Sequence, residues 1–433
     1  MEANVSSAPE IVVLARERSD LAPMDRWFPD VHVRAVIAGE ALAAFGGPDE
    51  AAAVVEDYDA TGEVETAVYA AHARCPITCL IAPHAHDAVR AARMREYLQL
   101  PGQDPESAVA FSDLVVMRGI WRMAGLPTVS SAPVESATDL VEYAARHDFP
   151  LRVQPRHSAS PARGRVLHSD QDVDAWLGRD WRLAPGTRST WMIEAHTGGR
   201  YLAVDGLWHH GMLEIAWVST IPDPHLTESG GQPVQITAML DLDDELVTRC
   251  RVLAGDALRM LPDPGPMAVH VELRITAGRI LLDRASVGLG TPATATMYER
   301  AFDLNLLRRA TIAQVDPLGL TTMTRPIPVR QAGYVSVPRR TGRVRALPRL
   351  LPGDFASSWL VSVDWYVQPG DLVGPDARLD QPAVVAVATG ENRAQVLARL
   401  AAFAAWAQEN VHYTTPRAPE LPVHTDPRVQ AAA

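Results

Sequence analysis

The chain has 433 residues, of which 47% are hydrophobic, and a formal net charge of −12. This length exceeds one ordinary domain and predicts two or three lobes, and the negative charge argues against nucleic acid and anionic membranes as partners. No apolar run reaches the roughly 18 residues of a membrane span, and the first ten residues do not have the pattern of a signal peptide. Only three cysteines are present. We therefore expect a cytoplasmic protein.

The most informative feature of the composition is that the chain contains no lysine. All 40 residues of the Lys+Arg pool are arginine. Arginine cannot replace the compact ammonium group that some sites need. A P-loop lysine, a Schiff-base lysine and a lysine general base are therefore excluded.

The N-terminal region alternates short apolar runs with helical patterns. The runs rich in β-branched residues predict strands at 10–15, 32–39, 51–57 and 77–83. Helices are predicted at 62–75 and 87–100. This alternation favours an α/β lobe with a doubly wound parallel sheet.

The next part predicts a smaller lobe. Helices are expected at 114–124 and 136–147, then a strand at 149–155 and a turn-rich loop at 156–165. A strand and a helix follow within 166–177.

The second half of the chain is dominated by β patterns. An antiparallel sheet is predicted over about 191–290, with a hairpin turn at Ala277-Gly278. A helix is expected at 298–313, and strands at 358–371 and 381–390. A long helix at 391–411 closes the fold, and a proline-rich tail follows it.

The order of these elements resembles the ATP-grasp superfamily, in particular its carboxylate–amine and amino-acid ligases. The resemblance covers roughly residues 85–410. It is carried by the segments 91–102, 111–118, 123–129, 143–155, 191–207, 270–290 and 367–374. It implies an N-terminal parallel lobe, a small central lobe and a mixed or antiparallel C-terminal lobe. The predicted divisions are 1–110, 111–188, 189–312, 313–412 and a flexible tail at 413–433.

The resemblance also implies chemistry with ATP and Mg²⁺. In the family a carboxylate attacks the γ-phosphate of ATP, and an amine then displaces phosphate from the acyl phosphate. Two lysines and the metal ions neutralise the crowded negative charges. This chain has Leu114 and Gln154 at the two lysine positions.

Other residues are candidates for nucleotide binding by the same resemblance. Arg156, Arg163 and Arg165 could supply positive charge, although solvated loop arginines are an equally good interpretation. Glu194 and Arg200 lie in the segment that corresponds to the adenosine-binding hinge.

The expected metal ligands are Glu272 and Asp283, which are eleven residues apart across the predicted hairpin. Strand alternation can point both carboxylates into one cleft. Ala285 replaces the family's metal-binding amide, and Val287 replaces its substrate-binding arginine. Arg284 or Arg274 could serve in place of that arginine.

Three functions remain open. The first is a ligase homologue of specialised metabolism with a degenerate ATP site, which binds or transforms a small amino-acid-like or carboxylate intermediate without ATP-dependent ligation. The second is a working ligase that holds ATP through arginines, and the third is a non-catalytic scaffold for an active paralogue. A homodimer is left open. His84 and His86 follow a strand, and we interpret them as structural or surface residues.

Overall fold

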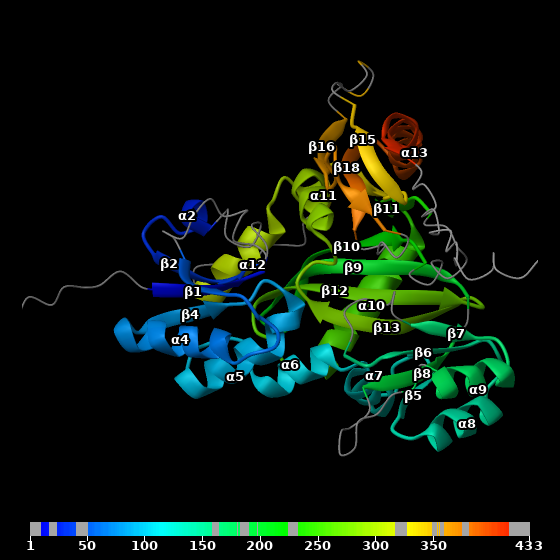
Figure 1. Ribbon diagram of the computed structural model, residues 1–433, viewed down its shortest axis with the longest axis horizontal. Coiled ribbons are helices and arrows are strands. Elements are labelled where there is room, and N and C mark those ends of the chain that lie inside the picture. Colours follow the sequence, from blue (N-terminus) through cyan, green and yellow to red (C-terminus); the bar gives the residue numbers. More distant parts are fainter. Residues whose placement is uncertain are drawn as a thin grey trace, which may run out of the picture.

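A computed structural model shows three lobes (Figure 1). It describes residues 10–16, 24–39, 51–157, 164–179, 181, 190–196, 198–223, 233–316, 327–348, 353, 355, 359–374 and 381–414. Arg163 and residues 415–433 of the predicted tail lie outside this part of the chain. Within the described part, no helix is both long and apolar enough to cross a membrane.

The N-terminal lobe, on the left in Figure 1, contains a parallel four-stranded sheet. Its strands, in spatial order, are β3 (Ala51–Val55), β2 (His32–Ala38), β1 (Glu10–Ala15) and β4 (Ile77–Ile81). Its helical segments are α2 (Met24–Trp27), α4 (Glu63–Arg74), η3 (Ala85–Asp87) and α5 (Ala88–Leu98). Helices α4 and α5 pack on one face of the sheet, whereas α2 and a later helix, α12 (Leu306–Val315), pack on the other. The predicted parallel lobe, with helices on both faces, is confirmed.

The small lobe, at the lower right in Figure 1, is an antiparallel four-stranded sheet with two helices. The strand order is β5 (Ser131–Val134), β8 (Trp191–Ala195), β6 (Leu151–Pro155) and β7 (Arg165–Leu167). The helices α8 (Ala137–Arg146) and α9 (Asp170–Arg179) bury Leu140, Tyr143 and Trp176 against this sheet. The prediction placed residues 191–195 in the central sheet, but β8 pairs with β5 and β6.

The core is one antiparallel eight-stranded sheet. Its order is β13 (Arg279–Val287), β12 (Met267–Thr276), β9 (Arg200–His209), β10 (Met212–Ile221), β11 (Gln235–Met239), β14 (Gln331–Pro338), β18 (Pro382–Gly390) and β16 (Leu360–Trp365). Because β11 pairs with both β10 and β14, the predicted C-terminal strands extend the core sheet.

Helices cover this sheet and join it to the other lobes. They are α6 (Pro105–Ser112), α7 (Leu114–Met123), α10 (Glu245–Met260), α11 (Pro292–Phe302), α12 and α13 (Arg393–Asn410). A small sheet of β17 (Leu372–Val373), β15 (Gly342–Ala346) and β19 (His412–Thr414) lies beside the C-terminal strands. The main hydrophobic core contains Trp121 of α7 and Tyr298 of α11, both buried.

The hairpin of β12 and β13 has a local irregularity that affects the site. Its turn residues, Ala277 and Gly278, have φ values of 46° and 74°, as a tight two-residue hairpin turn requires. From this turn, regular pairing would place Glu272 opposite Asp283. A β-bulge instead pairs Glu272 with Arg284, while Leu273 pairs with Leu282. The bulge thus changes which side chain lies beside Glu272.

Candidate functional site

Leu114 and Gln154, the residues expected at the family's lysine positions, have different surroundings. Leu114 begins α7, directly after the N-cap residue Asp113, and its backbone N–H donates to the carbonyl of Arg156 at 3.0 Å. The Leu114 side chain is buried in the main hydrophobic core. Gln154, on β6, is also buried, but it lies within a polar network.

We call this network the arginine–carboxylate cluster. It consists of Arg118, Arg152, Gln154, Glu194, Arg274 and Asp283. Its members come from α7, two strands of the small lobe (β6 and β8) and two strands of the core sheet (β12 and β13). Each residue is at most 3% exposed. The cluster therefore ties the small lobe to the core sheet inside the protein.

Arg118 is the central donor of the cluster. Its Nη1 donates to Glu194 Oε2 at 2.6 Å, and its Nη2 donates to Asp283 Oδ1 at 2.7 Å. Its Nε also donates to the carbonyl of Asp283 at 2.9 Å. Arg274 Nη2 contacts the same two carboxylates, at 3.2 Å and 3.3 Å.

Gln154 completes the cluster on the side of the small lobe. Its amide nitrogen donates to Glu194 Oε2 at 2.9 Å, and its oxygen accepts from Arg152 Nη1 at 2.8 Å. A neutral amide can both donate and accept, whereas a lysine could only donate. Gln154 is therefore suited to join a carboxylate and a guanidinium.

Electrostatics favour the charged forms of the paired residues. Burial acts to raise the pKa of Glu194, but Arg118, Arg274 and Arg152 together hold it well below its ordinary value. Burial acts to lower the pKa of Arg274, but Asp283 and Glu194 raise it above its ordinary value. Both residues consequently stay ionised at neutral pH as partners in buried ion pairs.

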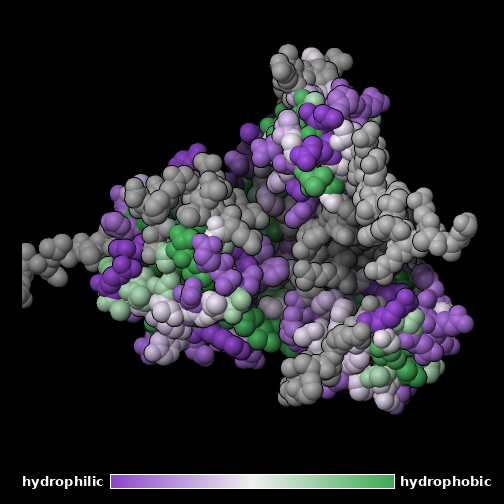
Figure 2. Space-filling model, viewed as in Figure 1, coloured by the Kyte–Doolittle hydropathy of each residue, from purple (hydrophilic) through white to green (hydrophobic). Residues whose placement is uncertain are grey.

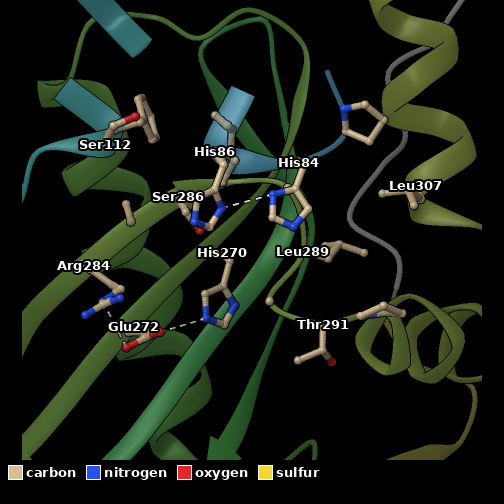
Figure 3. Close-up of a pocket in the computed structure, with 18 of the residues that line it drawn as sticks. His84, His86, Ser112, His270, Glu272, Arg284, Ser286, Leu289, Thr291 and Leu307 are labelled. Carbon is tan, nitrogen blue, oxygen red and sulfur yellow. Dashed lines mark hydrogen bonds and ion pairs between the residues drawn. The ribbon is translucent and has the colours of Figure 1, made fainter. Parts of the chain in front are cut away.

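Glu272 lies apart from this cluster, in the wall of a cavity of about 350 Å³. Its carboxylate lies 3.4 Å from His270 Nε2 and 3.5 Å from Arg284 Nε. Figure 3 shows His270, Glu272 and Arg284 side by side below His84 and His86. The structure thus gives the two predicted metal ligands, Glu272 and Asp283, different cationic partners.

The cavity lies where the lobes meet, and Figure 2 shows that the molecule is hollowed between the N-terminal and small lobes. The N-terminal lobe contributes His84 and His86, whose Nδ1 atoms lie 3.1 Å apart. The remaining wall residues include polar and apolar side chains from α6, α7, β13, α11 and α12 and from segments that follow β4, β6 and β13. They are Pro83, Ala85, Phe111, Ser112, Leu114, His157, Ala285, Ser286, Val287, Gly288, Leu289, Gly290, Thr291, Pro292, Ala295 and Leu307.

His270 connects the cavity wall to a buried carboxylate. Its Nδ1 lies 2.7 Å from Asp205 Oδ1, on the neighbouring strand β9. Burial acts to lower the pKa of His270, but Asp205 and Glu272 raise it well above 6.5. A Cβ atom at Gly290 would lie 2.8 Å from His270 Cε1, so a glycine is needed beside the ring. We therefore expect a fixed imidazolium in the cavity wall at neutral pH.

No contact between described residues brings the predicted arginines Arg156, Arg165 and Arg200 together around one site. Arg156 forms two hydrogen bonds with Asp113, at 3.0 Å and 2.6 Å. Arg165 is on β7 and Arg200 is exposed at the start of β9. Arg163 lies outside the described residues.

The described residues do not fit a magnesium–nucleotide site of the expected kind. Among them, no three His, Cys, Asp or Glu side chains converge in a way that could hold a metal ion. Asp283 is bound to two guanidinium groups, and Gln154 is bound to Glu194. Leu114 and Gln154, which were expected at the lysine positions, are both neutral.

Several features of the site were not predicted from the sequence, and the ion pair of His270 with Asp205 is one of them. Arg118 and Arg152 were not recognised as buried partners of Glu194, although a Gln at the strand position of the expected lysine hinted at a changed network. His84 and His86 were interpreted as structural or surface residues, but both line the cavity. Their only signal in the sequence was their position directly after a strand.

No family model matches this chain, and no curated protein matches it. Solved structures do match. An L-amino acid ligase from Bacillus licheniformis has a TM-score of 0.74 and 14% identity, and the match covers 95% of this chain and 100% of that one. A biotin carboxylase from Campylobacter jejuni has a TM-score of 0.68 and 12% identity, with 94% and 92% covered.

An N5-carboxyaminoimidazole ribonucleotide synthetase from Thermotoga maritima has a TM-score of 0.64 and 13% identity, and 92% of this chain and 98% of that one are covered. These matches extend over nearly the whole chain at low identity, so they establish the architecture. They agree with the parallel lobe, the small antiparallel lobe and the large antiparallel sheet described above. The chain therefore has the ATP-grasp fold of carboxylate–amine ligases.

Proposed function

We propose that this protein is a ligase homologue that binds a small amino-acid-like carboxylate in its main cavity and does not use ATP. It would act in the cytoplasm, in specialised metabolism, as a pseudoenzyme or a repurposed enzyme. The observation that carries the proposal is the arginine–carboxylate cluster. Its hydrogen bonds join the small lobe to the core sheet and involve Gln154 and Asp283, two positions where the family resemblance places nucleotide and metal ligands.

Energetics support the absence of nucleotide binding. A triphosphate would have to compete with Glu194 and Asp283 for Arg118 and Arg274. Each displaced carboxylate would then be buried without its partner, which costs several kcal/mol. No lysine is available to offset this cost.

The main cavity suits a small zwitterion or carboxylate. Glu272 and Arg284 present opposite charges next to each other at its wall. The carboxylate of such a ligand can bind the Arg284 guanidinium, and the ammonium group of the same ligand can bind Glu272. The volume of about 350 Å³ lies at the low end of ligand-binding cavities.

A substitution at Arg284 tests this binding. Arg284→Gln is expected to weaken the binding of small amino acids about ten- to hundredfold, because a charge-assisted contact to the ligand carboxylate is lost. Isothermal titration calorimetry with glycine, alanine and valine measures the change. Arg279→Gln, which removes an exposed arginine from the same strand, is the matched control. Binding that is equally strong in Arg284→Gln and the control would contradict this role of Arg284.

One observation favours a second function, that of a working ligase with an arginine-based ATP site. The cluster contains three arginines and two carboxylates, so it keeps a net positive charge. That function requires binding of Mg-ATP and release of phosphate in the presence of a carboxylate and an amine. The proposed function predicts neither.

A further inference from the structure

Two histidines that the proposed function does not use lie close together in the wall of the main cavity. They are His84 and His86, which follow β4, and we call them the histidine pair. Their Nδ1 atoms are 3.1 Å apart, whereas the ring centroids are 4.9 Å apart and the ring planes are tilted by 39°. The Nδ1 edges of the two rings therefore face each other, as the dashed line between them in Figure 3 shows.

This separation fits two imidazole ligands of one metal ion. A transition-metal ion binds an imidazole nitrogen at about 2.0–2.1 Å, so two such nitrogens at an angle of about 90–110° are about 3 Å apart. A hydrogen bond gives a similar distance when one of the nitrogens carries a proton. Only a metal-binding pair takes up an ion from solution, so a titration separates the two explanations.

The fold holds the turn that carries the histidine pair. Asp87, the residue after His86, is buried, and Arg16 donates to its two carboxylate oxygens at 2.7 Å and 2.8 Å. Arg16 follows β1 and the histidine pair follows β4, and these neighbouring strands lie where the strand order of the parallel sheet reverses. The carboxyl ends of strands at such a point are where open parallel sheets bind ligands.

The charges around the turn favour a cation. The ion pairs there join two arginines to three carboxylates, those of Arg16, Arg90, Asp59, Glu65 and Asp87. Their sum is one negative charge, which partly offsets the charge of a bound metal ion.

The ligand type indicates the class of metal. Imidazole suits Zn²⁺, Cu²⁺ and Ni²⁺, whereas Mg²⁺ prefers oxygen ligands. Among the residues that the structure describes, no third His, Cys, Asp or Glu joins the histidine pair to form a larger metal-binding group. The remaining positions on the ion would be filled by water or by donor atoms of a molecule in the cavity.

We propose that His84 and His86 together bind one divalent transition-metal ion through their Nδ1 atoms at the wall of the main cavity. His86 is exposed and His84 is half-buried, so an ion can reach them from solvent. This inference goes beyond the proposed function and does not depend on it, because neither Glu272 nor Arg284 is a ligand of the ion.

The test is a calorimetric titration of the untagged full chain with Cu²⁺, Zn²⁺ and Mg²⁺ at a pH of about 7.5, where an imidazole with an ordinary pKa is mostly neutral. Cu²⁺ should bind more tightly than Zn²⁺, and Mg²⁺ should give no binding heat. The electron paramagnetic resonance spectrum of the Cu²⁺ complex should show splitting from two nitrogen ligands. This spectrum requires no variant, so it does not depend on a substituted protein folding correctly.

Substitutions assign the ion to the histidine pair. His84→Gln and His86→Gln each remove one ligand and should weaken Zn²⁺ binding at least about tenfold. His168→Gln, at an exposed position between β7 and α9, is the matched control and should keep the wild-type affinity.

Three results would overturn the proposal. They are equal Zn²⁺ affinities of the wild type and both variants, a Cu²⁺ spectrum without splitting from two nitrogens, and no binding of Zn²⁺ at millimolar concentration. The last result would leave the histidine pair as a hydrogen-bonded contact. None of the three affects the proposed function, which is tested with amino acids and without metal.

Discussion

Replacing Arg118 by methionine is expected to lower the free energy of unfolding by about 3–5 kcal/mol. The substitution keeps a long apolar side chain in α7 but removes the donor that joins Glu194 to Asp283. Both carboxylates are buried, and each would lose its shortest hydrogen bond from a cation. Arg274 still contacts both, but at longer distances, so it can offset only part of the loss.

Urea denaturation followed by circular dichroism measures this change. Arg146→Met is the matched control, because Arg146 forms an exposed ion pair with Glu142 on the surface of α8. Exposed pairs of this kind contribute about 0–1 kcal/mol. Similar urea midpoints for Arg118→Met and Arg146→Met would show that the cluster contributes little to stability.

The second large effect is expected for His270→Gln. The imidazolium lies between Asp205 and Glu272, and its loss leaves the buried Asp205 carboxylate without its ion-pair partner. We expect a loss of about 3–5 kcal/mol near pH 6. Because Asp205 and Glu272 raise the pKa of His270 in the native state, protonation of this residue stabilises the fold.

The pH dependence of this effect has a definite sign. Because the pKa of His270 is raised in the native state, its protonation stabilises that state fully below the unfolded pKa of about 6.5. This stabilisation is lost as the pH rises through the native pKa. The difference in stability between wild type and His270→Gln should therefore shrink as the pH is raised from 6 toward alkaline values. Denaturation curves at several pH values measure it, with His168→Gln, at an exposed position, as the control. A difference that grows with pH would contradict the imidazolium assignment.

Local sequence patterns predicted most of the elements, because hydrophobic periodicity and turn residues act over short distances. The strand at 10–15 and the turn at Ala277-Gly278 are both present. The place of the strand at 191–195 could not be read in this way, because its neighbours β5 and β6 lie distant in the sequence. The same limit hid the continuation of the core sheet into its C-terminal strands.

The candidate site was predicted less completely, for two physical reasons. A β-bulge of one residue places Arg284 beside Glu272, while Asp283 accepts a hydrogen bond from Arg118. Such a shift in pairing leaves no clear sign in the sequence. The pairing of Arg118 with Glu194 and Asp283 spans 76 and 165 positions of the chain. By contrast, the absence of lysine could be read directly from the sequence. The degenerate nucleotide site predicted from it stays a prediction.

The most direct test of the central claim is a calorimetric titration of the wild-type protein with Mg-ATP. If the arginine–carboxylate cluster takes the place of a nucleotide site, the titration should give no binding heat up to millimolar Mg-ATP. The melting temperature should also stay unchanged. A bound ligand at a hundred times its Kd would instead stabilise the native state by about 2.7 kcal/mol and raise the melting temperature. Micromolar affinity for Mg-ATP would contradict the account and favour an arginine-dependent ligase.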